Sequence, residues 1–360
     1  MGKIKNIESI PTWQSKSFGV EIEFIHKPEG PQEELNNGNR LSNRAMAQAI
    51  RIRANEHIHV YNSLNSPAGV PEVQLPEVSI YGESYNHNTQ DYWKVVSDCT
   101  AIPTRRQERE GYFGNYELVS PILKGEKAKL HLKFILQAMR ELNCDVSRHC
   151  GLHVHHDARA WKEELANGNE DKCISKIVNL VTLVTKFENI IYGMLPKSRK
   201  PGGSNHRWCR SINQMMNNVF KHVNGKSQSK RGDKTKLTKK ALRTNGAFSY
   251  EFQSDRYCGL NFQSFYKYGS LEFRYGAPTL DFDKLFNWII FTQRFVISAE
   301  LFKSVNATNE MSLASEHDIY ITFIKVRDSL CLTRRMCKTP EELNASLWIR
   351  KRFNEHYIAA

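Results

Sequence analysis

Hydrophobic and polar residues alternate along residues 17–25, where apolar side chains at positions 20, 22 and 24 are separated by Glu21 and Glu23. Alternation with a period of two predicts a β-strand that has one apolar face. Glu21 and Glu23 then share the opposite face, because side chains alternate across a strand.

Several other segments have strand character. Two of them flank a Lys-Tyr-Gly connection, which is typical of a hairpin. The predicted strands are residues 92–97, 112–123, 151–156, 257–266 and 269–275.

Apolar residues recur at helical spacing between and after these strands, which predicts amphipathic helices. Strands and helices do not follow the regular alternation of a parallel sheet, so the pattern favours an α+β fold with a mainly antiparallel sheet. The predicted helices are residues 41–59, 126–142, 172–195, 208–220, 281–304, 315–329 and 340–356.

The composition, with 40% hydrophobic and 25% charged residues among 360, is that of a globular protein with a sizeable core. No internal repeat or clear linker divides the chain. We therefore expect one catalytic domain over residues 1–360, with a core at about 17–280 and a helical part at about 281–360.

No stretch of 18 residues is uninterruptedly apolar, and the first residues lack the apolar core of a signal peptide. The eight cysteines form no CxxC pair, and we expect them to be reduced core residues. These features predict a cytoplasmic protein without a membrane partner.

The chain carries 51 Lys and Arg against 38 Asp and Glu, a net charge of +13. Nine Lys and Arg against one Asp lie in residues 221–243, so we expect a basic flexible loop over about 221–245. This loop is interpreted as a solvated segment, a clamp over a polyanionic acceptor, or a nucleic-acid patch. It lacks the interleaved aromatic residues that favour the last interpretation.

Three predicted strands each carry two polar residues at spacing i, i+2, so that both point to one face. Taken singly, such a pair is typical of the solvated face of a strand. Taken together, the pairs contain acids, imidazoles and one guanidinium but no Lys, Ser or Thr. The pairs are Glu21 and Glu23, His153 and His155, and Glu272 and Arg274.

If these strands share a sheet, their carboxylates converge, and Glu117 in the segment NYELVSP can join them. Two carboxylates about 7 Å apart repel by roughly 2 kcal/mol at an effective dielectric near 20. Oxygen ligands with an occasional imidazole favour Mg²⁺ or Mn²⁺ over zinc. Because Mg²⁺ is commonly shared with substrate phosphates, Arg274 is a candidate donor to a phosphoryl group.

The segments FGVEIEF, CGLHVHHD and GSLEFRYG resemble strands of the glutamine synthetase and glutamate-cysteine ligase superfamily. Within it, the chain is most similar to the amidoligase branch, predicted carboxylate-amine ligases often met in phage and bacterial gene neighbourhoods. YELVSPIL, NHRWCRS and DRYCGLNFQS resemble intervening motifs. The resemblance covers about residues 18–279 and implies a curved sheet with helices packed on one face, like a glutamine synthetase catalytic domain.

The resemblance also implies ATP-dependent, Mg²⁺-dependent ligation. A carboxylate attacks the γ-phosphate of ATP, giving an acyl phosphate and ADP, and an amine then displaces phosphate to leave an amide. Mapped onto matching positions, the resemblance assigns metal ligands and phosphate contacts. Glu21, His153 and Glu272 would hold one metal, Glu23 and Glu117 a second, and His155 and Arg274 would contact the ATP phosphates.

The sequence departs from the superfamily at the second metal, where Glu117 stands without a second acid eight residues away. Asp98 is our substitute ligand. The small N-terminal domain of glutamine synthetase is missing, so its ring assembly is not carried over and the oligomeric state stays open. The family's basic and polar positions near acceptor or phosphates correspond to Arg207, Arg210, Arg256 and Asn261, although an arginine beside Trp208 or Tyr257 is also typical of a stacked surface pair.

Two other classes of function are open at this point. One is a two-metal nucleic-acid-processing enzyme or a nucleic-acid-binding protein, which would share the metals but not ATP. The other is a non-catalytic protein of the same fold, which the complete set of acids, imidazoles and arginine disfavours. For a ligase, the carboxylate and amine substrates can be small molecules, peptides or proteins, including an acidic or nucleic-acid-linked acceptor.

Overall fold

The computed structural model describes residues 7–29, 40–65, 74–86, 88–204, 206–213, 256–302 and 324–355. The chain divides into two compact units. The strand-rich unit comprises residues 17–154 and 276–286, and the helix-rich unit comprises residues 1–16, 155–275 and 287–360. The expectation of one catalytic domain over residues 1–360 stays a prediction.

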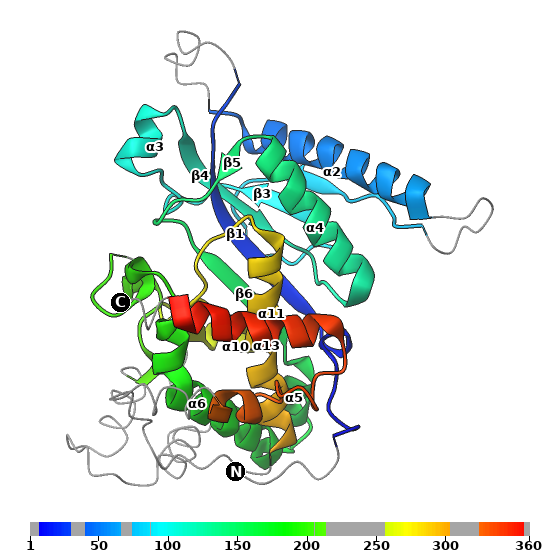
Figure 1. The fold of residues 1–360 in the computed structure, drawn as a ribbon, viewed down its shortest axis with the longest axis vertical. Coiled ribbons are helices and arrows are strands. Elements are labelled where there is room, and N and C mark those ends of the chain that lie inside the picture. The colour runs from blue at the N-terminus through cyan, green and yellow to red at the C-terminus, as the bar shows by residue number, and fades with distance from the viewer. Residues whose placement is uncertain are drawn as a thin grey trace. The chain divides into compact units, whose positions relative to one another are not determined.

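A single, mostly antiparallel sheet has the strand order β2-β3-β4-β1-β6-β8-β7, with β5 paired to β1 (Figure 1). The predicted combination of helices with a mainly antiparallel sheet is thereby confirmed, while its likeness to glutamine synthetase stays a prediction. Only β2 and β3 are parallel among the strand pairs whose register is described. The strands are β1 (Phe18–His26), β2 (Ile80–Gly82), β3 (Trp93–Val96), β4 (Phe113–Val119), β5 (Cys144–Asp145), β6 (Leu152–Asp157), β7 (Leu260–Asn261) and β8 (Ser270–Phe273).

The strand-rich unit is built on the β1–β4 pair, and the apolar residues Val20, Ile22 and Phe24 of β1 are buried as their alternation predicts. Helices α2 (Asn43–Asn65) and α4 (Gly125–Glu141) lie side by side and pack on neighbouring strands (Figure 1). Their buried residues recur at helical spacing, so hydrophobic burial holds both helices to the sheet. The short helix α3 (Arg105–Arg109) begins with a capping box.

The helix-rich unit contains α6 (Glu170–Gly193), whose residues are mostly buried. The amide of Asn179 on α6 donates to the carbonyls of Ala299 and Phe302, at the end of α11 (Phe282–Leu301). These bonds satisfy carbonyls that a helix end otherwise leaves without partners. The unit also contains β7, β8, the helices α5 (Arg159–Ala166), α10 (Gln263–Tyr268) and α13 (Pro340–Phe353), and the 3-10 helices η1 (Trp13–Ser15), η3 (Lys197–Arg199) and η4 (His206–Trp208).

The predicted hairpin of residues 257–266 and 269–275 is wrong in its first half. Strand β7 ends at Asn261, and residues 263–268 form the helix α10 before β8 begins. The side chain of Asn261 accepts a hydrogen bond from the backbone N–H of Gln263, which turns the chain out of the strand. Gly269 then ends the helix in the left-handed region, at φ 71°.

Three expectations lie wholly or partly outside the described residues. The basic loop at 221–245 is one of them. Of the predicted helix at 208–220, Trp208 ends a 3-10 helix and residues 212 and 213 are helical, and of the helix at 315–329, residues 324–329 are helical. Six cysteines are buried as expected, whereas Cys99 is exposed and Cys337 is half-buried.

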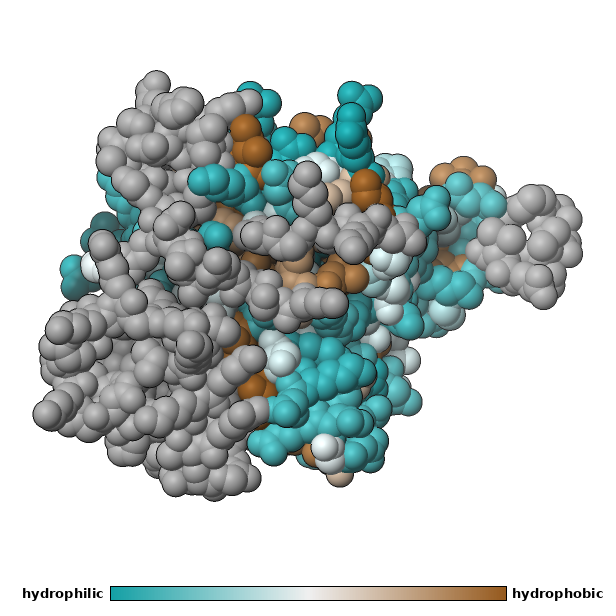
Figure 2. Space-filling model, turned by 90° about the horizontal axis from the view of Figure 1, so that it is seen from below, coloured by the Kyte–Doolittle hydropathy of each residue, from teal (hydrophilic) through white to brown (hydrophobic). Residues whose placement is uncertain are grey.

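None of the helices in the described part of the chain has the length and hydrophobicity needed to cross a bilayer. On the face shown in Figure 2, hydrophilic residues cover much of the described surface, and hydrophobic residues appear in small groups. Scattered apolar side chains of this kind are ordinary at a protein surface.

Candidate functional site

Three carboxylates of the strand-rich unit come together, two from strands β1 and β4 and one from the turn after β3. The antiparallel register of β1 and β4 places Glu23 directly opposite Glu117, and Val96 at the end of β3 pairs with Glu117 from the other side. Asp98 follows β3 by two residues. One oxygen from each of Glu23, Asp98 and Glu117 lies within 4.8 Å of the others.

These carboxylates are held in place by local backbone geometry. The Gly151 N–H donates to Glu23 Oε2 at 2.8 Å. The N–H and hydroxyl of Thr100 both donate to Asp98 Oδ1, at 2.7 and 2.6 Å, in a tight turn. The turn fixes the direction of the Asp98 carboxylate toward the strands.

The close approach of three acids is energetically costly. Glu23 and Glu117 are each only 5% exposed, so water screens them little. Each pair of charges 4.8 Å apart repels by about 3.5 kcal/mol at an effective dielectric of 20. Acids directly opposite each other on adjacent strands also destabilise a sheet. A divalent cation would relieve this repulsion, and oxygen ligands suit Mg²⁺ and Mn²⁺.

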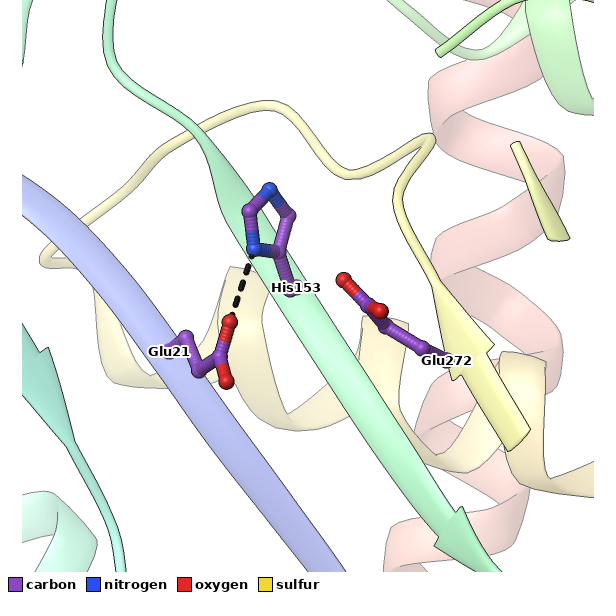
Figure 3. A group of neighbouring side chains, drawn as sticks. All are labelled: Glu21, His153 and Glu272. Carbon is purple, nitrogen blue, oxygen red and sulfur yellow. Dashed lines mark hydrogen bonds and ion pairs between the residues drawn. The ribbon is translucent and has the colours of Figure 1, made fainter. Parts of the chain in front are cut away.

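A contact between two predicted site residues, Glu21 and His153, joins β1 to β6 in the strand-rich unit. The Nδ1 atom of His153 lies 2.9 Å from Glu21 Oε2, and Figure 3 shows the other ring nitrogen pointing away from Glu21. An imidazole nitrogen beside a carboxylate oxygen is a donor pair that one divalent cation can use.

Gly151 separates this pair from the three acids. A Cβ atom at this position would lie 2.5 Å from Glu23 Oε1 and 3.0 Å from His153 Nε2. No side chain fits into that space, so the absence of a Cβ lets the imidazole and the carboxylate approach from both sides. The Glu21–His153 pair and the three-carboxylate cluster are therefore neighbours within one unit.

Glu272 is the third side chain of the group drawn in Figure 3, and it belongs to the helix-rich unit. It pairs with Asn261 across β7 and β8, and the Asn261 amide donates to Glu272 Oε2 at 2.5 Å. The Arg274 guanidinium donates to Glu272 Oε1 at 2.5 Å. Arg274 also donates from Nε to the carbonyl of Trp208, at 3.4 Å. The predicted Glu272–Arg274 pair is thus an ion pair supported by Asn261.

The other predicted residues of the helix-rich unit lie as follows. His155 is half-buried, with Nδ1 3.2 Å from Ser270 Oγ. Arg207 lies over the ring of Trp208 at 4.7 Å, and Arg256 lies over Tyr257 at 5.2 Å, which matches the stacked pairs that the alternative interpretation predicts. Arg210 is exposed, and its backbone is bonded to Tyr257 and Gly259.

One organising residue escaped the sequence analysis. Glu188 on α6 is 2% exposed and accepts hydrogen bonds from the Tyr275 hydroxyl at 2.6 Å, from Ser211, and from Ile212 N–H at 2.7 Å. Burial, followed by the charge of Glu188, raises the pKa of Tyr275 well above its usual value, which keeps the phenol as a donor. The available signal was a carboxylate within the most apolar stretch of the chain.

The comparisons with known proteins agree with the resemblance seen in the sequence. A search of curated proteins finds no match. A family model described as "Putative amidoligase enzyme" matches residues 14–296, which include every residue assigned above to the site. This match supports ligase chemistry and gives no support to a nucleic-acid enzyme. The chain belongs to the amidoligase family.

Proposed function

We propose that this protein is an ATP-dependent, Mg²⁺-dependent carboxylate-amine ligase. A substrate carboxylate oxygen attacks the γ-phosphorus of ATP and the bond to the β-phosphate oxygen breaks, giving an acyl phosphate and ADP. An amine nitrogen then attacks the acyl carbon, phosphate leaves, and the amine loses a proton. The single observation that carries the proposal is the gathering of Glu23, Asp98 and Glu117 in a member of the amidoligase family.

The donor set fits divalent cations. Glu23, Asp98 and Glu117 offer only oxygen atoms, which suits Mg²⁺ or Mn²⁺ at one site. Glu21 and His153, with Glu272 as the third ligand, are proposed to hold a second ion. When bound, such ions neutralise the charge of a transferring phosphoryl group.

The chain's own residues would orient the nucleotide around these ligands. Arg274 donates to Glu272 and to the carbonyl of Trp208, and we assign its guanidinium to a phosphate oxygen of the nucleotide, as the family resemblance implies. Asn261 holds Glu272 from the other side. We assign His155 and Arg256 to the nucleotide, and Arg207 and Arg210 to the substrates, as the family resemblance implies. Catalysis then consists of positioning and charge neutralisation, and no side chain acts as a nucleophile.

The proposal is tested by ADP release. The full chain is incubated with ATP and Mg²⁺, with pools of carboxylates and amines added separately and together, and products are searched by mass spectrometry for two components joined with loss of water. We expect ADP release that requires a carboxylate pool, and a joined product only when both pools are present. Absence of carboxylate-dependent ADP release across all pools would contradict the proposal.

Glu272 has its own test within the same assay. The Glu272→Gln variant should lose carboxylate-dependent ADP release, because an amide is a poorer cation ligand and a poorer partner for Arg274. The matched control is Glu163→Gln, at an exposed position of the same unit. Equal turnover in both variants would remove Glu272 from the site.

A further inference from the structure

Asp98 is the carboxylate of the proposed cation cluster that lies outside the strands. Glu23 and Glu117 belong to β1 and β4, whereas Asp98 lies in the turn that follows β3. Thr100 fixes the Asp98 carboxylate within this turn, but its bonds do not fix the turn to the sheet. Because connecting segments are more mobile than strands, a ligand in a turn needs further contacts to stay beside two strand carboxylates.

The turn is bonded to β4 through Asn115. The Asp98 N–H donates to the carbonyl of Asn115 at 3.3 Å, and the Asn115 N–H donates to the carbonyl of Ala101 at 2.6 Å. Asn115 has a left-handed backbone, φ 69°, which asparagine tolerates better than most residues. It lies where the register of β4 against β1 shifts, between Phe113 and Tyr116. The position of Asp98 therefore depends on an irregular residue of β4.

A guanidinium group holds this irregular end of β4. Arg40, three residues before α2, donates from Nε to the carbonyl of Gly114 at 3.0 Å and from Nη2 to the carbonyl of Asn115 at 2.5 Å. Its Cζ atom lies 4.1 Å from the centre of the Tyr116 ring, at a cation–π distance. One side chain thus contacts three consecutive residues of β4, including the carbonyl that receives the Asp98 N–H.

The same guanidinium reaches the residue before Asp98. Nη2 of Arg40 lies 3.5 Å from Ser97 Oγ and 3.1 Å from Asn43 Oδ1. The Asn43 amide also donates to Ser97 Oγ, at 3.0 Å. Asn43 is the first residue of α2, whose buried apolar side chains anchor the helix to the sheet. Arg40 therefore joins the turn of Asp98 to both β4 and α2.

We propose that Arg40 is a positioning residue for Asp98, which keeps the turn carboxylate at the cation site formed with Glu23 and Glu117. The inference rests on the proposed function, whose cation site it deepens. Groups that hold metal ligands typically change metal affinity by about 10- to 100-fold when they are removed. Arg40 acts through the backbone of Asn115 and the side chain of Ser97, and we assign it no contact with the ion.

The sign of the effect separates positioning from charge. Arg40 is a positive charge in the same unit as the three acids, so its charge by itself opposes the binding of a cation. Loss of that charge alone would strengthen cation binding, whereas loss of the contacts to Asn115 and Ser97 would weaken it. Weaker cation binding in an Arg40 variant is therefore the signature of positioning.

The first test is titration of the full chain with Mn²⁺ in the absence of nucleotide, with free Mn²⁺ followed by electron paramagnetic resonance. Arg40→Gln should raise the dissociation constant about tenfold, the lower end of the range for a group that holds a ligand. The matched control is Arg44→Gln, which removes an exposed arginine of the same unit. Its dissociation constant should stay within about twofold of the wild type, because water and salt screen an exposed charge.

The second test is hydrogen exchange of the full chain without divalent cations, which separates a local role from a general one. A peptide covering residues 97–101 should exchange faster in Arg40→Gln than in the wild type, while peptides of α4 should keep the wild-type rate. Faster exchange in α4 as well would show that Arg40 serves the whole unit and would overturn the inference.

A dissociation constant for Mn²⁺ in Arg40→Gln equal to or below that of the wild type, or an equal rise in Arg44→Gln, would also overturn the inference. Either result leaves the proposed ligase function standing. The expected Mn²⁺ and exchange results in a chain without carboxylate-dependent ADP release would refute only the ligase function. A wild-type chain that binds no Mn²⁺ would refute the cation site and the inference together.

Discussion

Two regions of the molecule bury carboxylates in opposite ways. In the helix-rich unit, the Glu342 carboxylate on α13 pairs with the Arg294 guanidinium at 2.5 Å, and neither side chain is exposed to water. The backbone N–H groups of Trp13 and Lys338 also donate to this carboxylate. In the strand-rich unit, Glu23 and Glu117 face each other and Asp98. Donors and positive charge surround the Glu342 carboxylate, whereas the carboxylates that we propose to bind a cation face one another.

The comparison predicts which buried acid the fold depends on. Changing Glu342→Gln leaves the Arg294 guanidinium buried without its counter-charge, so the free energy of unfolding should fall by about 3–5 kcal/mol in urea titrations. The control Glu355→Gln breaks a surface pair with Arg352 on the same helix end and should cost less than about 1 kcal/mol. Equal losses of unfolding free energy in both variants would show that the fold does not depend on the buried pair of Glu342 and Arg294.

The three-carboxylate cluster should respond in the opposite sense. Glu117→Gln removes one of three mutually repelling charges, so without divalent cations its free energy of unfolding should equal or exceed that of the wild type. Carboxylate-dependent ADP release should nevertheless fall roughly 100-fold or more, as when one electrostatic contact to a transition state is removed. Glu110→Gln, at an exposed ion pair of the same unit, should keep both properties.

A stability loss in Glu117→Gln as large as that in Glu342→Gln would show that Glu117 serves the fold. Unchanged ADP release in Glu117→Gln would show that it does not serve the reaction.

Divalent cations sharpen the same contrast. Adding Mg²⁺ at 100 times its dissociation constant should stabilise the wild type by about 2.7 kcal/mol, because binding to the folded chain shifts the unfolding equilibrium. Thermal unfolding with and without EDTA measures this shift. Glu342→Gln should keep the Mg²⁺-dependent increment despite its lower baseline, and Glu117→Gln should lose most of it. An equal increment in all variants would place the ion elsewhere.

The smallest expected effect is the pH dependence of stability that comes from His156, a buried imidazole with a hydrogen-bond partner. Its Nε2 lies 2.8 Å from the hydroxyl of Thr292, and burial lowers its pKa from 6.5 to about 3. Between about pH 6.5 and pH 3, His156 is therefore protonated in the unfolded chain but neutral in the folded chain. The stability contribution of neutral His156 is complete above pH 6.5 and falls by about 1.4 kcal/mol per pH unit between pH 6 and pH 4.

Urea titrations at pH 7.5, 5.5 and 4.5 measure this slope. His156→Gln should have a shallower slope than the wild type, while His59→Gln, at an exposed position, should keep the wild-type slope. Parallel slopes in all three proteins would contradict a neutral, buried His156.

The sequence predicted the strands that carry the acids because alternation is a local property. It placed Glu21 and Glu23 on one strand and offered Asp98 as a ligand, but only the register of β1, β3 and β4 shows that Asp98 meets Glu23 and Glu117. The strand predicted to include residues 263–266 is a helix instead, because the hydrogen bond from Gln263 N–H to the Asn261 side chain overrides the strand preference of this aromatic segment.

Glu188 was missed for a related reason. Its donors come from residues 211–213 and from Tyr275, far along the chain, so no local pattern shows that the carboxylate is satisfied. Contacts that depend on long-range pairing are the part of a site that a single sequence does not specify.

The claim that Glu23, Asp98 and Glu117 form a cation site is tested most directly by anomalous diffraction from crystals of the wild-type chain soaked in Mn²⁺. The account predicts an anomalous peak within coordination distance of all three carboxylates, and its disappearance in Glu117→Gln crystals treated in the same way. A Mn²⁺ peak that lies elsewhere in the wild type, or one that persists among these residues in Glu117→Gln, would contradict it.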